Sequence, residues 1–199
     1  MSTERTVCVV DDDADVRDSL AMLLSRRYRV LTFESAHAFL AAGITAHDTC
    51  VLADIRMPEM DGLALQREIN RTIPGMPVII MTGHGDVPMA VQAMKEGAVE
   101  FLEKPFERTA LLGALDSAFT RLAPAPAAAP DLAARRALTD REKDVFDLLV
   151  EGHQNKVIAH KLGISTRTVE VHRARVMDKL GVRNLADLVR LSLGRGTPR

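Results

Sequence analysis

The chain lacks the features of a membrane-spanning or secreted protein. No run approaches the roughly 18 consecutive apolar residues of a membrane span. The N-terminal stretch MSTERTVCVV reaches a strand-like run too early for a signal peptide. Only two cysteines occur, Cys8 and Cys50, and each lies inside an apolar run. We therefore expect buried free thiols rather than a disulfide, a cytoplasmic protein and no membrane association.

Repeats and zinc-ligand spacings are also absent. No segment of the 199 residues repeats, and no pattern of Cys and His has the spacing of a zinc site. The chain does have 47% hydrophobic and 27% charged residues, the proportions of a folded protein with a substantial core. Its length fits one large or two small domains.

The net charge of −1 conceals two halves of opposite sign. Residues 1–122 hold 12 Lys and Arg against 18 Asp and Glu, whereas residues 131–199 hold 14 against 9. Between them, the segment LAPAPAAAPDLAARRA is too rich in proline at its start for a continuous helix and predicts an extended linker. We predict an acidic domain at 1–122, a linker at 123–137 and a basic domain at 138–199, which is a nucleic-acid-binding candidate.

The first half alternates strand-like and helical patterns. Short apolar runs are followed by segments whose apolar residues recur at helical spacing, such as Val16, Leu20 and Leu23. Five such pairs in about 120 residues predict a doubly wound α/β fold with a five-stranded parallel sheet. We expect strands at 6–10, 28–33, 49–54, 77–82 and 99–103, and helices at 14–27, 36–42, 63–71, 87–96 and 107–122.

Polar residues occupy the carboxyl ends of these strands, where an open parallel sheet binds its ligands. They are Asp11 and Asp12, Asp54, Thr82 and Lys104. Converging carboxylates stay ionised together when a hard cation lies among them, and oxygen ligands suit Mg²⁺ or Mn²⁺. A hydroxyl and an ammonium opposite the acids suit a phosphoryl group, which a carboxylate could attack to form an aspartyl-phosphate.

Each of these residues alone also has an ordinary explanation. A single acid at a strand end is more often solvated, and a single lysine there is more often a surface charge. The whole set at the ends of four strands is hard to explain in this way, because no structural need calls for all five residues together. We therefore interpret the set as one site.

Four stretches of the first half resemble the receiver domains of bacterial two-component response regulators. They are VVDDDADVR, VLADIRMPEMDG, the MTG after the fourth strand and FLEKPF. The longer string TGHGDVPMAVQAMKEGAVEFLEKPFE resembles the FixJ subgroup. Over residues 5–122 the resemblance implies that Asp54 is the phosphoacceptor and that Lys104 pairs with the phosphate. It implies that Thr82 and Phe101 are switch residues and that the Lys104-Pro105 bond is cis. The implied metal ligands are Asp11, Asp12, Asp54 and the Arg56 carbonyl.

The second half has the pattern of a helix-turn-helix domain. Thr139 and Glu142 form a capping-box pair at the start of a helix that ends at Gly152. Further helices are expected at 156–162, 166–180 and 184–193, and a short helix, a glycine turn and a longer helix form the motif. The strings LTDRE, NKVIAHKLGIS and TVEVHRARVMDKL resemble the LuxR/FixJ-type four-helix domain, which implies that Lys156 and Lys179 contact the DNA backbone.

The helix predicted at 166–180 has two distinct faces. At about 100° per residue, Val169, Val176 and Leu180 form a core face. Val171 and Ala174 fall on the opposite face, where they are either incidental surface residues or contacts for thymine methyl groups. The DNA-binding candidates on this helix are Thr166, Arg167, Glu170, Val171, Arg173, Ala174 and Arg175.

Together the two resemblances imply a phosphorylation-switched transcriptional regulator, expected to be an activator that binds double-stranded operator DNA and acts with RNA polymerase. A sensor histidine kinase would phosphorylate it, and the FixJ likeness suggests an oxygen or redox signal. Phosphorylation is expected either to release the basic domain from the receiver or to dimerise the protein across two half-sites. Dimerisation would use 87–96, 99–103 and 107–122 of the receiver, and the last helix, 184–193, would dimerise the DNA-binding domain. We expect no enzymatic activity beyond the protein's own phosphorylation and dephosphorylation.

Two other functions fit parts of the sequence. Aspartate-nucleophile phosphatases also place acids, Thr and Lys around Mg²⁺, but they carry the nucleophile after the first strand and have a lid domain. Hydrolysis of external phosphomonoesters over many turnovers would indicate such an enzyme. A regulator that binds DNA without phosphorylation would not need the acids, the hydroxyl and the lysine together.

Overall fold

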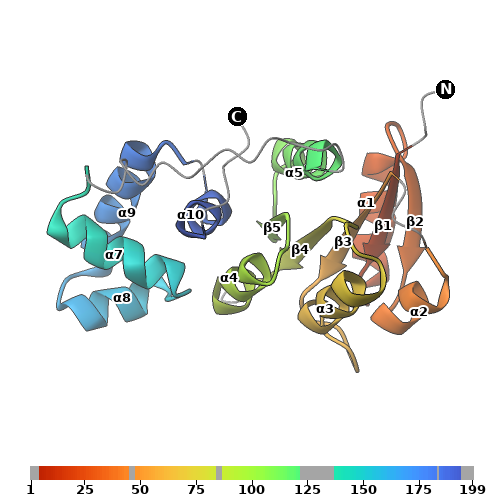
Figure 1. The fold of residues 1–199 in the computed structure, drawn as a ribbon, viewed down its shortest axis with the longest axis horizontal. Coiled ribbons are helices and arrows are strands. Elements are labelled where there is room, and N and C mark those ends of the chain that lie inside the picture. Colours follow the sequence, from red (N-terminus) through yellow and green to blue (C-terminus); the bar gives the residue numbers. More distant parts are fainter. Residues whose placement is uncertain (1–4, 45–47, 84–86, 122–136, 183, 194–199) are drawn as a thin grey trace. The chain divides into compact units, whose positions relative to one another are not determined.

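The N-terminal part of the chain is built on a five-stranded parallel sheet (Figure 1). The computed structural model describes residues 5–44, 48–83, 87–121, 137–182 and 184–193. The strand order β2-β1-β3-β4-β5 is the doubly wound order, as predicted, and its winding reverses between β1 and β3, where such sheets bind ligands. The strands are β1 (Thr6–Val10), β2 (Arg29–Phe33), β3 (Thr49–Asp54), β4 (Val78–Thr82) and β5 (Glu100–Glu103).

The central strands form because they are apolar on both faces. Every residue of β3 and of β4 is buried, as expected of parallel strands covered by helices on each side. Alternate side chains of the sheet, such as Val9, Leu52 and Ile79, share a core with Leu20 and Leu115 of the helices on one face. Both cysteines are buried free thiols, as predicted, and burial raises the pKa of the Cys8 thiol to about 12.

Five helices accompany the sheet, and their boundaries differ from prediction by only a few residues. The largest difference is at the helix predicted to reach Arg27, which ends at Leu24, because Ser25 caps it and the Tyr28 N–H closes a turn on the Leu24 carbonyl. The Lys104-Pro105 bond is cis, as predicted. The helices are α1 (Ala14–Leu24), α2 (Ala36–Ala41), α3 (Gly62–Thr72), α4 (Val87–Lys95) and α5 (Arg108–Arg121).

The C-terminal part is a small helical unit with a helix-turn-helix. Its helices are α7 (Asp140–Val150), α8 (Asn155–Leu162), α9 (Thr166–Leu180) and α10 (Leu185–Ser192), close to the predicted ranges. α7, α8 and α9 contact one another, and α10 contacts α7. Gly163, in the left-handed conformation, ends α8, and Ser165 caps the start of α9, so the turn between the two helices is fixed at both sides.

Two further observations concern membrane-spanning helices and the predicted linker. No helix in the described ranges has the length and apolar character needed to cross a membrane. The predicted linker at 123–137 lies outside the described residues except for Ala137, and so does residue 122 of the predicted helix before it.

A buried carboxylate joins the start of α7 to the end of α9. The predicted capping box is present: the Thr139 hydroxyl accepts from the Glu142 N–H, and Glu142 Oε2 accepts from the Thr139 N–H at 2.8 Å. The Lys179 ammonium donates to the same Oε2 at 2.7 Å and to the Ala137 carbonyl at 3.3 Å. Lys179 and the Thr139 N–H together lower the pKa of the Glu142 carboxyl to about 2.

This pair predicts an acid-sensitive stability of the helical part. The folded pKa of Glu142 lies below its ordinary 4.5, so the pair stabilises the fold above about pH 4.5 and is lost as the pH falls toward 2. Glu142→Gln should therefore destabilise the helical part at pH 7. It should also flatten the acid limb, that is, the fall of the unfolding free energy as the pH drops below about 4.5, measured by hydrogen exchange of the α7 amides. Asp144→Asn, at an exposed acid of the same helix, is the control and should keep the wild-type acid limb. An unchanged acid limb in Glu142→Gln would contradict the assignment.

Candidate functional site

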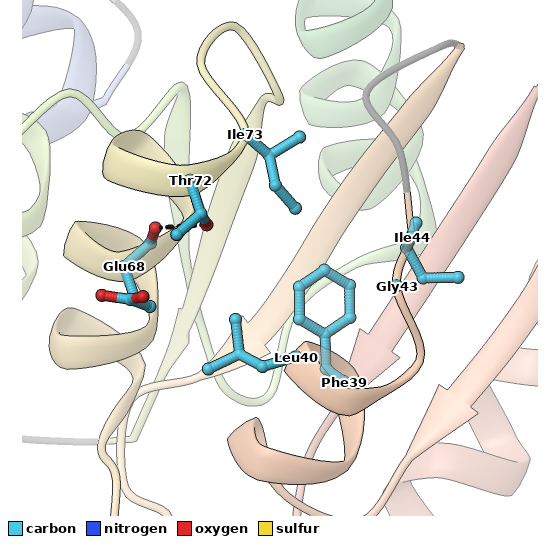
Figure 2. Close-up of a pocket in the computed structure, with 7 residues that line it drawn as sticks. All are labelled: Phe39, Leu40, Gly43, Ile44, Glu68, Thr72 and Ile73. Carbon is cyan, nitrogen blue, oxygen red and sulfur yellow. Dashed lines mark hydrogen bonds between the residues drawn. The ribbon is translucent and has the colours of Figure 1, made fainter.

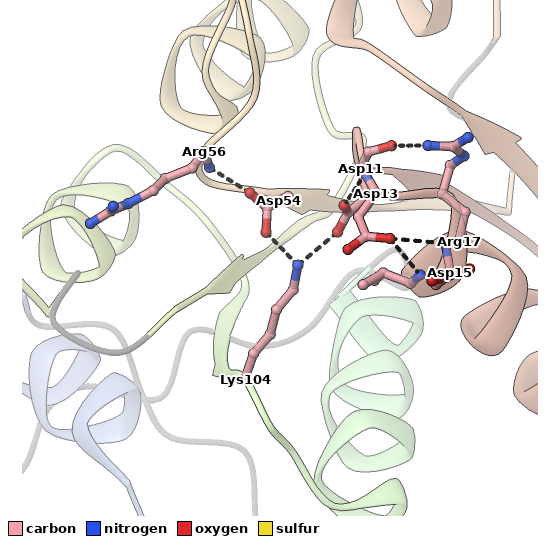
Figure 3. Close-up of polar contacts among 8 residues, drawn as sticks. Asp11, Asp13, Asp15, Arg17, Asp54, Arg56 and Lys104 are labelled. Carbon is pink, nitrogen blue, oxygen red and sulfur yellow. Dashed lines mark hydrogen bonds and ion pairs between the residues drawn. The ribbon is translucent and has the colours of Figure 1, made fainter.

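The ends of β1, β3 and β5 bring two carboxylates onto one ammonium (Figure 3). Lys104 Nζ donates to Asp11 Oδ2 at 2.7 Å and to Asp54 Oδ1 at 2.5 Å. Val10 pairs with Ala53 across the sheet, so Asp11 and Asp54 leave neighbouring strands at the same level. Both acids are buried, and Lys104 is partly buried. Three of the five predicted strand-end residues therefore meet at the point where the winding of the sheet reverses.

Asp54 is held through both of its carboxylate oxygens. Oδ1 accepts from Lys104, and Oδ2 accepts from the Arg56 backbone N–H at 2.6 Å. Burial raises the pKa of the Asp54 carboxyl, and the hydrogen bonds from Lys104 and Arg56 partly offset this rise. Burial lowers the pKa of the Lys104 ammonium, but its two carboxylate partners outweigh this effect and the net shift is upward. The result is a desolvated carboxylate with a fixed orientation, as a nucleophile requires.

Asp11 anchors the loop between β1 and α1. Its Oδ1 accepts from the Asp13 N–H at 2.9 Å, and its backbone carbonyl accepts from the Arg17 guanidinium at 2.7 Å (Figure 3). Asp13 is the N-cap of α1 and uses Oδ1 to accept from the N–H groups of Asp15 and Val16. Asp13 therefore has a structural role, which is consistent with a predicted ligand set that left it out.

Asp12 does not join the other two acids, contrary to our expectation that three carboxylates converge. It is exposed, and its carboxylate makes no hydrogen bond or ion pair with another described residue. Nowhere in the described ranges do three carboxylate, His or Cys side chains lie close enough together to hold a metal ion. The physical reason is charge: one ammonium compensates two buried carboxylates, and a third acid without a cation is better solvated.

The donor set nevertheless fits a hard divalent cation. Asp11 and Asp54 are oxygen donors that already converge on one positive group, the Lys104 ammonium, within 2.7 Å. Asp12 lies next to Asp11 in the chain and has no competing partner among the described residues. Oxygen ligands of this kind suit Mg²⁺ or Mn²⁺, and carboxylates bind such ions while the remaining positions hold water.

The predicted switch residues lie on β4 and β5, the adjacent strands. Thr82 is buried, and its hydroxyl donates to the Gly83 carbonyl at 3.2 Å, a long bond that a better acceptor could replace. Phe101 is half-buried in β5 and pairs with Ile80 of β4. His84 of the MTGH stretch lies outside the described residues.

Gly62 is a site residue that the sequence analysis did not single out. A Cβ at this position would lie 2.3 Å from the Asp54 carbonyl oxygen and 3.0 Å from the Ile55 Cα. The Gly62 N–H also donates to the Ile55 carbonyl at 3.1 Å, so α3 starts directly against the backbone of the phosphoacceptor candidate. The Asp-Gly pair of VLADIRMPEMDG was the available signal, since Asp61 caps α3 and only glycine fits the next position.

The polar face of α9 is exposed as the helical angles predicted. Val169, Val176 and Leu180 are buried. Val171 on the other side is 45% exposed, which is compatible with a DNA contact and with an incidental surface residue. Of the remaining candidates, Arg173 is half-buried and Thr166, Arg167, Glu170, Ala174 and Arg175 are exposed.

The structure separates the two predicted backbone-contact lysines. Lys156, on the first turn of α8, is exposed and can reach a phosphate. Lys179 is also exposed, but its ammonium is already bound by Glu142 and the Ala137 carbonyl. In α10, Leu185, Leu188 and Val189 are buried, whereas Leu193 at its C-terminal end is 38% exposed.

A hollow of about 450 Å³ lies between α2 and α3 (Figure 2). Its polar wall is the Glu68 carboxylate, which Arg71 binds at 2.6 Å. None of the strand-end acids, Thr82 or Lys104 lines it, so it is separate from the site above. Its walls are mostly apolar and comprise Phe39, Leu40, Gly43, Ile44, Glu68, Thr72 and Ile73.

The contact of Gly62 with the Asp54 backbone gives a stability prediction. Gly62→Ala should destabilise the N-terminal part by about 1–3 kcal/mol, the usual cost of overpacking, because the Asp54 carbonyl must move away from the new methyl group. Urea unfolding measures this change. Gly113→Ala in α5 is the matched control, because a Cβ there meets no atom within 4 Å and alanine favours a helix. Equal stability of the Gly62→Ala protein and the wild type would contradict the contact.

Comparison with known proteins identifies the family. A model of the response regulator receiver domain matches residues 7–116, and a model of the luxR family of bacterial regulatory proteins matches residues 136–192. The chain is 47% identical over 201 residues to the transcriptional regulatory protein FixJ of Bradyrhizobium diazoefficiens, covering 98% of each protein. Full-length FixJ from B. japonicum aligns in structure with a TM-score of 0.57 at 46% identity, covering 96% of this chain and 97% of that one. The chain therefore belongs to the FixJ-type two-component response regulators, phosphorylation-activated regulators of transcription that join a receiver domain to a LuxR-type DNA-binding domain.

Proposed function

We propose that Asp54 is the phosphoacceptor of this response regulator and that a sensor histidine kinase phosphorylates it. The observation that carries the proposal is the shared ammonium of Lys104, which holds Asp54 and Asp11 at the reversal point of the sheet. Like Asp11, which accepts from Lys104 and the Asp13 N–H, Asp54 is fixed through both carboxylate oxygens by donors from other residues, Lys104 and the Arg56 N–H. It thus has the defined direction that in-line attack on phosphorus needs.

The chemistry is a transfer of one phosphoryl group. An Asp54 oxygen attacks the phosphorus of a phosphohistidine, a P–O bond forms, the P–N bond breaks and the histidine nitrogen keeps the bonding electron pair. Asp11, Asp12, Asp54 and the Arg56 carbonyl would hold Mg²⁺, which would neutralise charge on the transferred group. The Lys104 ammonium then exchanges a carboxylate oxygen for a phosphoryl oxygen, with its charge already in place. The receiver catalyses no reaction beyond its own phosphorylation and dephosphorylation.

The readout starts from the two switch residues. Among the described residues, the partner of the Thr82 hydroxyl is the Gly83 carbonyl at 3.2 Å, and a phosphoryl oxygen is a stronger acceptor. As Thr82 turns toward it, Phe101 on the adjacent strand gains room to rotate inward, and the surface of α4, β5 and α5 changes. We propose that this changed surface dimerises the receiver and that the partner kinase, rather than this chain, senses the oxygen or redox signal.

The output is sequence-specific binding of double-stranded operator DNA. The exposed face of α9 enters the major groove, where Val171 and Ala174 meet thymine methyl groups and Glu170 accepts from cytosine. Lys156 and the arginines of α9 bind phosphates or guanine. We propose that the bound dimer, completed by the last helix, activates transcription through RNA polymerase.

The assignment of Asp54 is tested by acyl-phosphate formation. Asp54→Ala should abolish hydroxylamine-sensitive labelling by acetyl phosphate, because it removes the carboxylate that is proposed to attack phosphorus. Asp18→Ala, at an exposed acid of α1, is the control and should label like the wild type. Mass spectrometry of the labelled peptides locates the group. Labelling of Asp54→Ala at the wild-type level, on another residue, would overturn the assignment.

The role of Lys156 is tested by the salt dependence of DNA binding. Lys156→Ala should weaken binding to all DNA sequences and reduce the slope of log affinity against log salt by about 1, because one phosphate contact is lost. Lys143→Ala in α7, where Asp140 already pairs with the lysine, is the control for a change of charge. Fluorescence anisotropy with two unrelated duplexes measures both slopes. A loss confined to one duplex would instead make Lys156 a base-reading residue.

A further inference from the structure

The side chain of Arg17 binds the backbone of the acid loop (residues 11–13) rather than an acid. Its NH1 donates to the Asp11 carbonyl oxygen at 2.7 Å (Figure 3). Arg17 lies on the first turn of α1, and its own N–H donates to the Asp13 carbonyl at 3.1 Å. The residue therefore ties the start of the helix to the end of β1 through both its backbone and its side chain.

Arg17 completes the hydrogen bonding of Asp11. The Asp11 N–H donates to the Phe33 carbonyl at 3.1 Å, Oδ1 accepts from Asp13, and Oδ2 accepts from Lys104. The carbonyl is the one remaining polar group, and Arg17 is its partner. Without the guanidinium, this carbonyl beside a buried side chain would lose a charge-assisted hydrogen bond, and the peptide would be free to turn.

The consequence falls on Asp12, whose two flanking peptides are each clamped by one side chain. The Asp11–Asp12 peptide is held at its carbonyl by Arg17, and the Asp12–Asp13 peptide is held at its N–H by Asp11 Oδ1. The Asp12 carboxylate has no partner of its own among the described residues, so the backbone sets the direction of the Cα–Cβ bond from which it extends. Of the two clamps, only Arg17 comes from outside the acid loop.

We infer that Arg17 is a positioning residue for the divalent-cation site: it fixes the Asp11–Asp12 peptide so that Asp12 is presented beside Asp11 and Asp54. This inference rests on the proposed function, because it takes Asp12 as a metal ligand. Arg17 touches neither the phosphoryl group nor the cation in this account, and it acts through the backbone of the loop that carries two of the ligands.

The charge of Arg17 makes the inference testable, because loss of its charge and loss of its positioning contact would change the affinity for a divalent cation in opposite directions. Removing a cation from beside several carboxylates would by itself strengthen the binding of a divalent cation. Loss of a positioning contact would weaken it. A weaker metal affinity in an Arg17 variant therefore cannot come from the loss of charge.

The experiment measures Mn²⁺ binding to the full chain by electron paramagnetic resonance, with Mg²⁺ as competitor. Arg17→Met, which keeps the aliphatic stem but loses the donors, should raise the dissociation constant about tenfold, as expected for one charge-assisted hydrogen bond. Arg17→Lys, which keeps the charge and one donor, should recover part of the affinity. Arg26→Met, at an exposed arginine just beyond α1, is the charge-matched control and should stay within about twofold of the wild type.

A second readout separates positioning from catalysis. In self-phosphorylation by acetyl phosphate, the Mg²⁺ concentration at half-maximal rate should rise in Arg17→Met, whereas the rate at saturating Mg²⁺ should stay within about threefold of the wild type. Unchanged or tighter Mn²⁺ binding by Arg17→Met would overturn the inference, as would an equal loss in Arg26→Met. If Arg17→Met does not fold, as judged by circular dichroism, Arg17→Ala takes its place, and unchanged or tighter Mn²⁺ binding by that variant would overturn the inference. Absence of Mn²⁺ binding by the wild type would instead overturn the metal site of the proposed function.

Discussion

The contact of Lys104 with Asp11 and Asp54 is the constraint on which the receiver site depends. Two carboxylates that are almost fully buried cannot stay ionised side by side without a compensating cation, because burial removes the water that would otherwise screen them. The ammonium reaches both only because β1, β3, β4 and β5 are in a fixed register, so that Asp11, Asp54 and Lys104 leave the sheet at the same edge. The apolar strands thus serve the chemistry by holding three charges in place.

A comparable constraint operates in the helix-turn-helix domain. Glu142 caps the start of α7 and binds Lys179 from the last turn of α9, so one carboxylate joins α7 to the helix that is proposed to read DNA. The exposed face of α9 is consequently a rigid surface, with Val171 and the arginines at set positions. In both domains a buried acid paired with one lysine defines the geometry of the functional surface. The two domains differ in what that surface presents, carboxylates in one and basic or small apolar groups in the other.

Sequence reasoning predicted most of the fold because the strands are short apolar runs and the helices have clear caps, as at Ser165 and Thr139. It also predicted Asp11, Asp54 and Lys104, since strand ends of a parallel sheet share one edge. Asp12 could not be told from Asp11 in the run of three acids, because only the folded loop decides which of them turns inward. The ion pair of Lys179 with Glu142 was not predicted, because the two residues are distant in sequence. Arg17 was missed because its partner is a backbone carbonyl, which leaves no pattern in the sequence.

The central claim is that phosphorylation of Asp54 controls DNA binding, and a titration tests it directly. A DNA fragment selected by the full-length protein is titrated with the wild type and with Asp54→Asn, each with and without acetyl phosphate and Mg²⁺. The account predicts that acetyl phosphate strengthens binding by the wild type by about tenfold, a typical coupling between two sites, and leaves Asp54→Asn unchanged. An equal gain in Asp54→Asn, or no gain in the wild type, would contradict it.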